Sequence, residues 1–396
     1  MMRVLMAGQT YRPATNGAAV FTVHLAEGLA RAGHSVLVLM PSDRGYAYSA
    51  TFDGVHVRAV SALSLAPFYP DIYVTFLPGH DVGRALDEFQ PDVVHIQDHY
   101  PLSRAVLKRA RQRRLPVVGT NNFLPGNMLP QMPLPACSRP LLEQILWKTV
   151  LDVFNQVDVV TAATETSATI LRQQGVRRPV QVISSGVDLA RFRPDPDLDR
   201  AAVRRRYGLD PGRTLFLFVS RLDPEKRVDL LLRALYRLGR DDVQLAVAGR
   251  GRQLRELQAL ADSLGLGQRV VFTGFVPGCD LPGLLNSADI FVMPGEAELQ
   301  SIATLEAMAT GRPVLAANAC ALPELVHNGV NGYLFRAGDV GDATHCMARL
   351  LAERERWAAM GEASLAIARS HELSNTIRSY EALYHQMKPL MELVTT

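Results

Sequence analysis

Short apolar runs recur along the whole chain, and amphipathic stretches of helical length separate them. The runs are mostly apolar and do not alternate strictly, which is typical of strands buried on both faces of a parallel sheet. The pattern therefore predicts two successive βα-repeating halves. In the first half the runs are RVLMAG, SVLVLMP, VHVRAV, DVVHIQ, PVVGTN, VDVVTAA and PVQVISSG, and in the second TLFLFVS, VQLAVAG, RVVFTG, DIFVMPG, RPVLAAN and NGYLF.

The stretch GVDLARFRPDPDLDR at residues 186–200 interrupts this pattern with Pro, Asp and Arg. We interpret it as a linker between two domains, a number that suits a chain of 396 residues. The expected fold class is α/β, with two Rossmann-like, doubly wound parallel-sheet domains that face a cleft. Ligands of such sheets bind at the carboxyl ends of the strands, so the active site is expected there.

The composition excludes several classes of protein. A formal net charge of +3 is too small for a nucleic-acid binder. Cys137, Cys279, Cys320 and Cys346 have no paired spacing, which indicates reduced thiols and argues against a disulfide scaffold or a zinc cluster. The N-terminal apolar run lacks a cleavage-site pattern, and no apolar run is long enough to span a membrane. A cytoplasmic protein is expected, and attachment to a membrane surface stays open.

Two cations follow the strand predicted in TLFLFVSRLDPEKRVDLLLRAL, residues 214–235. Asp223 and Pro224 suit the cap and the first position of a helix. That reading places Arg221 at the strand exit and Lys226 at the start of the helix. Two cations beside a helix N-terminus suit a dianion or a diphosphate. A solvated charged turn is the alternative.

Two glutamates mark the next candidate, PGEAELQSIATLEAMATGRPV at residues 294–314. Glu298 precedes the predicted helix and Glu306 lies within it, about 12 Å further along the axis. Carboxylates accept hydrogen bonds from sugar hydroxyls, and the helix N-terminus favours a phosphate between them. The spacing therefore suits a nucleotide sugar. The alternative is that Glu298 caps the helix and Glu306 is solvated. The residues expected around the helix start are Leu299, Gln300, Ser301 and Ile302.

A third candidate is Gly17 in ATNGAAVF, directly after the first predicted strand. Glycine at the start of a helix lets a ligand approach the backbone closely. The segment lacks the G-x-G-x-x-G spacing, which argues against a dehydrogenase.

Several of these segments resemble the family-4 retaining glycosyltransferases of the GT-B fold, over nearly the whole chain. The resemblance includes the two glutamates with seven residues between them, together with the upstream Arg and Lys. It also implies the domain bounds, with an acceptor domain at 1–190, a donor domain at 191–372, and a helix at 373–396 that packs back on the first domain. The segments are TNGAAVFTVHLAEGLARAGH, SSGVDLARFRP, SRLDPEKRVDLLLRA, VAGRGRQ, FTGFVP, ADIFVMPGEAELQSIATLEAMATGRPVLA and ALPELVHNGVNGYLF.

The resemblance also implies roles for the candidate residues. Arg221 and Lys226 would bind the donor diphosphate, Glu298 the donor-sugar hydroxyls and Glu306 the ribose, while the Gly17 loop approaches the phosphates. No metal or other cofactor is expected, because the two cations and the helix dipole stabilise the leaving diphosphate. The Asp195-Pro-Asp197 sequence imitates a metal-binding D-x-D motif, and we interpret it as linker.

The form AELQSIATLEAMA is similar to that of bacterial diacylglycerol glycosyltransferases and of mannosyltransferases that act on lipid anchors. It implies transfer of a hexose with retention, from UDP-glucose first, to a lipid hydroxyl such as that of diacylglycerol. A GDP-mannose donor, a soluble or polysaccharide acceptor, and a non-enzymatic nucleotide-sugar binder are the alternatives. A nucleotide-sugar epimerase shares the architecture, and the full Arg, Lys and two-Glu set argues against it.

One segment departs from the family. In VGTNNFLPGNMLP, Asn122 stands where relatives have His and Gly126 where they have Glu. Asn binds a hydroxyl but cannot move a proton, so His99 becomes the other titratable candidate for catalysis. A structural loop residue is the alternative for His99. Asn122, Phe123 and Asn127 define the expected acceptor region.

The first half also has features of a membrane-docking surface. The segment SRAVLKRARQRRLP has six basic residues and no acid, a pattern that suits anionic lipid, although a solvated helix face is the alternative. Apolar segments at 61–79 and 123–147 would insert. Peripheral attachment to the inner face of the cell membrane follows as an expectation. The basic residues are Arg104, Lys108, Arg109, Arg111, Arg113 and Arg114.

Overall fold

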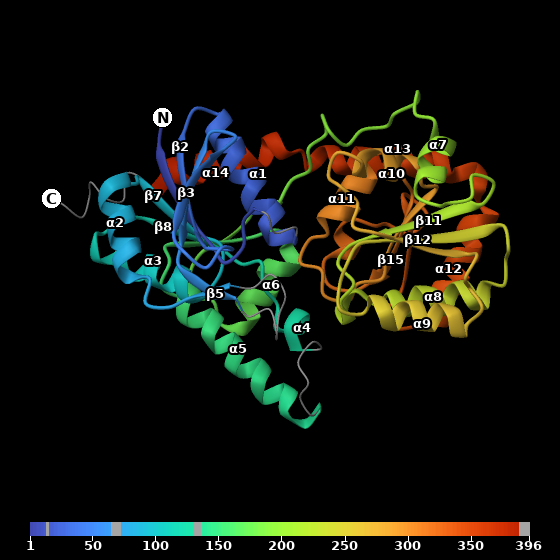
Figure 1. Ribbon diagram of the computed structural model, residues 1–396, viewed down its shortest axis with the longest axis horizontal. Coiled ribbons are helices and arrows are strands. Elements are labelled where there is room, and N and C mark those ends of the chain that lie inside the picture. Colours follow the sequence, from blue (N-terminus) through green and yellow to red (C-terminus); the bar gives the residue numbers. More distant parts are fainter. Residues whose placement is uncertain (13–15, 65–72, 130–135, 388–396) are drawn as a thin grey trace. The chain divides into compact units, whose positions relative to one another are not determined.

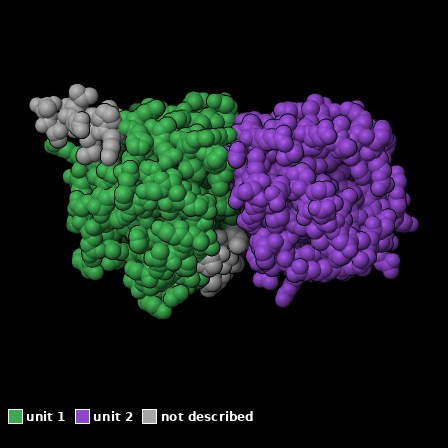
Figure 2. Space-filling view, turned by 90° about the horizontal axis from the view of Figure 1, so that it is seen from above, with its two compact units in different colours: residues 1–125, 134–185, 373–396 green, residues 126–133, 186–372 purple. Residues whose placement is uncertain are grey.

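The computed structural model describes residues 1–12, 16–64, 73–129 and 136–387. The chain forms two compact units, coloured separately in Figure 2. Unit 1 comprises Met1–Pro125, Leu134–Ser185 and Leu373–Thr396, and unit 2 comprises Gly126–Pro133 and Gly186–Glu372. Unit 1 is therefore built from segments that are far apart in the sequence.

Unit 1 contains a sheet in the order β10-β9-β8-β7-β1-β2-β4-β3, parallel except for the β3–β4 pair. All seven runs predicted as strands in the first half form strands. Three further strands were not predicted: β3, an exposed antiparallel edge, and the short hairpin of β5 with β6. The strands are β1 Arg3–Ala7, β2 Ser35–Pro41, β3 Tyr48–Phe52, β4 Val55–Val60, β5 Ala62–Ser64, β6 Tyr73–Thr75, β7 Val93–Ile96, β8 Val117–Thr120, β9 Val159–Ala162 and β10 Val180–Val182.

Helices cover both faces of this sheet (Figure 1). α1 connects β1 to β2 and α3 connects β7 to β8, in opposite directions along the sheet. Right-handed crossovers therefore place them on opposite faces. The helices of unit 1 are α1 Gly17–Arg31, α2 Gly79–Phe89, α3 Pro101–Gln112, α5 Arg139–Phe154, α6 Glu165–Gln174 and α14 Leu373–Met387, whereas α4 Pro125–Met128 belongs to unit 2 except for its first residue.

The C-terminal helix α14 is an integral part of unit 1. It packs against α1 at Gly28, where any Cβ would come within 2.4 Å of the Ile377 side chain. A buried polar network continues the contact: His95 Nδ1 lies 2.7 Å from the Tyr384 hydroxyl, and His95 Nε2 lies 2.6 Å from Thr120 Oγ1. Burial lowers the pKa of His95 to about 3, so the ring is neutral.

Unit 2 contains a sheet of six parallel strands in the order β13-β12-β11-β14-β15-β16, as the second set of apolar runs predicted. The strands are β11 Thr214–Val219, β12 Val243–Ala248, β13 Val270–Gly274, β14 Ile290–Met293, β15 Val314–Asn318 and β16 Gly332–Arg336. The α-helices are α7 Arg200–Arg206, α8 Val228–Leu238, α9 Leu254–Ser263, α10 Leu281–Ser287, α11 Ile302–Ala309, α12 Val340–Ala352 and α13 Trp357–Ser370.

The predicted linker packs against unit 2. Phe192 is fully buried in the core of this unit, and the Asp195 amide donates to Asn286 at 3.1 Å. Asp195 Oδ1 accepts from the Asp197 amide at 3.2 Å, so this carboxylate stabilises a local turn. The stretch is thus anchored to unit 2 at Phe192 and Asp195, while most of its side chains from 190 to 200 are exposed.

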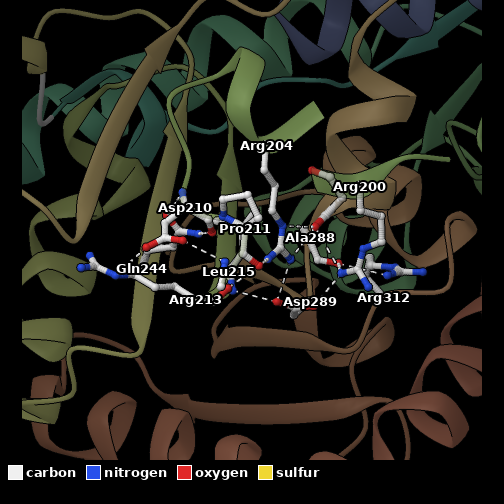
Figure 3. Close-up of polar contacts among 12 residues, drawn as sticks. Arg200, Arg204, Asp210, Pro211, Arg213, Leu215, Gln244, Ala288, Asp289 and Arg312 are labelled. Atoms are coloured by element: carbon white, nitrogen blue, oxygen red, sulfur yellow. Dashed lines mark hydrogen bonds and ion pairs between the residues drawn. The ribbon is translucent and has the colours of Figure 1, made fainter. Parts of the chain in front are cut away.

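An arginine cluster fastens α7 to the same unit (Figure 3). The buried guanidinium of Arg204 donates to the Asp289 carboxylate at 2.8 Å, to the Ser287 carbonyl at 2.7 Å and to the Arg213 carbonyl at 3.0 Å. Asp289 also accepts from Arg200 at 2.6 Å and from the Leu215 amide at 2.8 Å, which ties α7 to the start of β11.

Candidate active site

The strand order of unit 2 reverses between β11 and β14, since β12 and β13 extend from one side and β15 and β16 from the other. Ligands of doubly wound sheets bind in the crevice outside such a reversal, at the carboxyl ends of the strands. Arg221 follows β11 by two residues and Glu298 follows β14 by five. The sheet therefore brings the two predicted donor-binding segments to the reversal point.

Lys226 and Glu298 form a direct ion pair. The Lys226 amine donates to Glu298 Oε1 at 2.5 Å, and the two side chains are 14% and 10% exposed. The Glu298 carbonyl accepts from the Ala321 amide at 3.1 Å, which fixes the loop after β14 against the loop after β15. The pair is held across 72 residues of sequence, so no local motif could have indicated it.

Arg221 lies in an acidic setting. Its guanidinium pairs with Asp223 and also contacts Glu225 at 3.3 Å. Burial raises the pKa of Glu225, and the neighbouring Arg221 and Lys226 oppose that rise. The cation is therefore positioned by two carboxylates from its own loop.

The helix predicted to start at Pro224 starts later. Pro224–Lys226 form a single 3₁₀ turn, η3, and α8 begins at Val228. Arg227 separates them because its backbone is left-handed, with φ of 50°. Asp223 precedes the 3₁₀ turn but makes no side-chain cap hydrogen bond there. Its carboxylate pairs with Arg221 instead, so the prediction of a capping Asp223 was wrong.

α11 starts within the group of residues expected there. Ser301 is the N-cap, and its Oγ accepts from the Thr304 amide at 3.4 Å and from Thr304 Oγ1 at 2.8 Å. Ile302 is the first helical residue, and Leu299 and Gln300 precede the cap. The first-turn amides of α11 thus follow the Glu298 loop directly, where a helix N-terminus favours an anion.

Glu306 is buried inside α11. Its side chain is 8% exposed, and no described residue donates a hydrogen bond or ion pair to its carboxylate. Burial raises the pKa of Glu306 to about 7, while Arg191 acts in the opposite direction. The alternative of a solvated Glu306 is therefore wrong. Sequence analysis gave Arg191 no role, although it lies in the family-like segment SSGVDLARFRP, because that segment overlaps the stretch interpreted as linker.

The residues singled out in unit 1 lie at the same end of its own sheet. Gly17 is the first residue of α1, after the Asn16 cap, and open space surrounds the position of its missing Cβ. His99 is buried between the rings of Tyr100 and Phe123, at centroid distances of 4.7 Å and 4.8 Å. Burial and the nearby Arg104 lower the pKa of His99 to about 4, so its imidazole is neutral at pH 7.

The predicted acceptor residues follow β8. Asn122 is partly buried, and its Nδ2 has no hydrogen-bond partner among the described residues. Phe123 stacks on His99, and Asn127 lies partly buried in α4. Gly126 has open space around the position of its missing Cβ.

The basic segment consists of α3 and the two residues after it, and three of its six predicted lipid-binding cations bond residues in other parts of the chain. Arg104 donates to the Thr149 carbonyl at 2.6 Å, Arg111 donates to the Gln156 carbonyl, and Arg113 pairs with Asp87 at 2.7 Å. No ion pair with an acid forms at Lys108, Arg109 or Arg114 among the described residues. Because the sequence of α3 contains no acid, it could not indicate the ion pair with Asp87, which lies in α2.

Within the described residues, no group of three or more His, Cys, Asp or Glu side chains is arranged to hold a metal ion. No described helix has the length and apolar character needed to cross a bilayer.

The chain matches two family models, "Glycosyltransferase Family 4" over residues 15–191 and "Glycosyl transferases group 1" over residues 199–366. It is 39% identical over 219 residues to a GDP-mannose-dependent alpha-(1-6)-phosphatidylinositol monomannoside mannosyltransferase of Mycolicibacterium smegmatis, covering 53% of this chain and 57% of that protein. The alignments to the first relatives thus span less than two thirds of those proteins.

A longer alignment relates the chain to a GDP-mannose-dependent alpha-mannosyltransferase of Mycobacterium tuberculosis, with 30% identity and coverage of 90% of each protein. Among solved structures, sucrose-phosphate synthase from Thermosynechococcus elongatus superposes with a TM-score of 0.80 at 19% identity, over 98% of this chain and 99% of that chain. Together with two Rossmann-like units of parallel sheet, these matches assign the chain to the family-4 glycosyltransferases, which have the GT-B fold.

Proposed function

We propose that this glycosyltransferase moves a hexose from a nucleotide sugar to a hydroxyl group of a lipid acceptor, with retention of configuration. The observation that carries the proposal is the buried Lys226–Glu298 pair at the strand-order reversal of unit 2. A diphosphate that enters there attracts Lys226 and Arg221, and Glu298 is then released to accept hydroxyl groups of the donor sugar. Glu306, which is buried and has no hydrogen-bond partner among the described residues, is suited to the ribose diol.

The proposed reaction is a same-face displacement. The bond from the anomeric carbon to the diphosphate oxygen breaks, and the acceptor oxygen bonds to that carbon on the same face. The departing phosphate oxygen takes the proton of the acceptor hydroxyl. Arg221, Lys226 and the first-turn amides of α11 stabilise the charge that develops on the diphosphate, and this set needs no metal ion. His99 is neutral and buried, so it is suited to positioning and poorly suited to proton transfer at pH 7.

GDP-mannose is the donor we place first, with UDP-glucose second. The sequence motif alone favoured UDP-glucose, but Glu298 cannot by itself distinguish hexoses that differ in one hydroxyl orientation. Two relatives at 30% identity or more are named as GDP-mannose-dependent enzymes.

The acceptor we propose is a lipid presented at a membrane surface, to which the protein attaches peripherally. One such relative is named for a phosphatidylinositol substrate. Unit 1 exposes Phe76 and Leu77 just before α2, Leu77 with 96% of its surface in solvent. A groove beside the start of α2 is lined by His80, Arg84, Arg109 and Arg113, together with the acids Asp87 and Glu88. Apolar side chains beside cations suit an anionic bilayer.

The experiment that tests this function is a donor-by-acceptor screen with purified protein. GDP-mannose, UDP-glucose and UDP-galactose would each be combined with diacylglycerol or phosphatidylinositol in anionic micelles and with soluble sugars. A glycolipid product is expected. Transfer only to soluble sugars would remove the lipid acceptor and keep the enzyme. Nucleotide binding without any transfer would favour the non-catalytic binder, for which Asn122 and Gly126 are the relevant departures from the family.

A further inference from the structure

Unit 1 has its own strand-order reversal, between β1 and β7. Gln97 directly follows β7 at this point and is 3% exposed. Neither its Oε1 nor its Nε2 has a hydrogen-bond partner among the described residues. Gly8, directly after β1, makes room for it, since a Cβ at Gly8 would lie 2.9 Å from the Gln97 Cβ. A buried amide with both polar atoms unpaired is unfavourable unless another group or molecule pairs them.

Other unpaired polar atoms lie close in the fold to Gln97. Thr75 Oγ1 on β6, His99 Nδ1 and Asn122 Nδ2 are buried atoms without a partner in the described structure. The elements that hold them are joined: Gln9 donates to the Tyr73 carbonyl on β6, and Ile96 of β7 is in register with Gly119 of β8. Native proteins leave few buried polar atoms unsatisfied, so this group, at the ends of β7 and β8 and on the adjoining β5–β6 hairpin, indicates a ligand.

The charge of these groups indicates which ligand chemistry fits. Gln97, Thr75 and Asn122 are uncharged, and the low pKa of His99 keeps its ring neutral. The charged neighbours have partners: Asp98 accepts from Gln9, Ser103 and Tyr100, and Arg104 donates to the His99 and Thr149 carbonyls. Neutral donors and acceptors match hydroxyl groups and leave a phosphate monoester without a counter-charge.

We propose that Gln97, with Thr75, His99 and Asn122, binds uncharged hydroxyl groups of the acceptor and selects against a phosphorylated one. This inference rests on the proposed function and adds the chemical class of the acceptor group. The hydroxyls belong either to an acylglycerol or to a sugar. Gln97 is a positioning residue, and the reacting hydroxyl is held by the set as a whole.

The test replaces Gln97 with Met, which keeps the length of the side chain and removes the amide. The matched control is Gln244→Met, because Gln244 is equally buried but both of its amide atoms bond Asp210, at 3.0 Å and 2.6 Å (Figure 3). We expect Gln97→Met to melt no lower than the wild type, to keep its nucleotide affinity, and to raise the acceptor KM at least tenfold. Gln244→Met should melt lower and leave the acceptor KM unchanged.

Selectivity is measured on the wild type with diacylglycerol, methyl α-mannoside and methyl α-mannoside 6-phosphate. Use of diacylglycerol would identify the bound hydroxyls as those of an acylglycerol, and use of methyl α-mannoside would identify them as those of a sugar. The phosphorylated sugar should be used at least tenfold less well than its neutral parent. Binding of methyl α-mannoside, followed by saturation-transfer NMR with GDP present, gives a readout that needs no turnover. The wild type should bind it, and Gln97→Met should not.

Three results would overturn the proposal: a lower melting temperature for Gln97→Met with an unchanged acceptor KM, equal binding of methyl α-mannoside by both proteins, or preference for the phosphorylated sugar. The first of these results would mean that the Gln97 amide forms hydrogen bonds with enclosed water and thereby stabilises the fold. Absence of nucleotide binding by the wild type would instead contradict the proposed function. The nucleotide and acceptor measurements therefore distinguish the two failures.

Discussion

The Lys226 amine and the Glu298 carboxylate neutralise each other in the free protein at 2.5 Å. Removing one partner of a buried ion pair leaves the other charge uncompensated. The two residues should therefore respond differently to substitution, because a diphosphate can replace Glu298 as the partner of Lys226 but cannot replace Lys226 as the partner of Glu298.

We expect Glu298→Ala to abolish transfer while nucleotide affinity is retained or increased. Lys226→Ala should weaken nucleotide binding at least tenfold and lower the melting temperature. Calorimetry with GDP and UDP, together with thermal unfolding, measures both effects. Equal loss of nucleotide affinity in the two variants would remove the separate roles assigned to them.

Glu306 predicts a pH dependence of nucleotide binding. Burial raises the pKa of its carboxyl from 4.5 to about 7 in the free protein. Ribose hydroxyls donate best to the ionised form, so nucleotide affinity should fall as the pH drops below 7, by up to tenfold per unit. Glu306→Gln should flatten this profile. A profile that keeps its shape in the variant would assign the titration to another group.

The same carboxyl has an effect on stability with the opposite sign to an ordinary salt-bridged acid. The folded state holds the proton up to about pH 7, and the unfolded state loses it near 4.5. As the pH rises from 4.5 to about 7, the free energy of unfolding should therefore fall by about 1.4 kcal/mol per pH unit. Glu306→Gln should melt higher than the wild type at pH 8 and similarly at pH 4.5.

At the scale of elements, the arginine cluster holds α7 on unit 2. Arg204→Ala removes a buried guanidinium from Asp289 and from backbone carbonyls, so we expect a loss of about 3–5 kcal/mol in the free energy of unfolding. Arg206→Ala is the control from the same helix, since its pair with Asp280 is exposed and should contribute about 1 kcal/mol or less. Urea unfolding measures the difference, and similar losses would show that burial is not the cause.

The contacts of α3 divide its basic residues into two groups. A variant in which Gln replaces Lys108, Arg109 and Arg114 together should be released from anionic vesicles and keep its melting temperature. Arg104, Arg111 and Arg113→Gln should lower the melting temperature, because these side chains bond Thr149, Gln156 and Asp87. Sedimentation with vesicles that contain a fifth of anionic lipid gives the first result. Unchanged sedimentation of the first variant would exclude α3 as the docking surface.

The sequence predicts elements better than it predicts their partners. Each apolar run that we predicted to be a strand forms one, because strands buried on both faces have a nearly continuous apolar sequence. The edge strand β3 and the β5–β6 hairpin gave no such signal, since their side chains are largely exposed. The donor residues were found from local spacing, whereas the Lys226–Glu298 pair and the unpaired amide of Gln97 depend on which strand ends become neighbours in the sheet.

On the scale of the whole molecule, the two units differ in how the chain builds them. The sheet of unit 2 and all of its helices except α4 come from the continuous stretch Gly186–Glu372, whereas unit 1 also needs α14, Leu373–Met387. We expect a fragment of residues 186–372 to fold and bind nucleotide on its own. A fragment of residues 1–185 should aggregate, because α1 would expose the face that α14 covers at Gly28. Circular dichroism and gel filtration of both fragments check this, and a soluble, folded 1–185 fragment would contradict it.

The position of α14 also sets an order of events during synthesis. The sheet of unit 1 leaves the ribosome first, but His95 meets Tyr384 only after nearly the whole chain has been translated. At roughly 5–20 residues per second, the nascent first unit waits on the order of 10–40 s for its last helix. Unit 2 can be complete by then. The first part of the chain to be made is thus the last to be finished, and for that interval its apolar helix face is a binding site for chaperones.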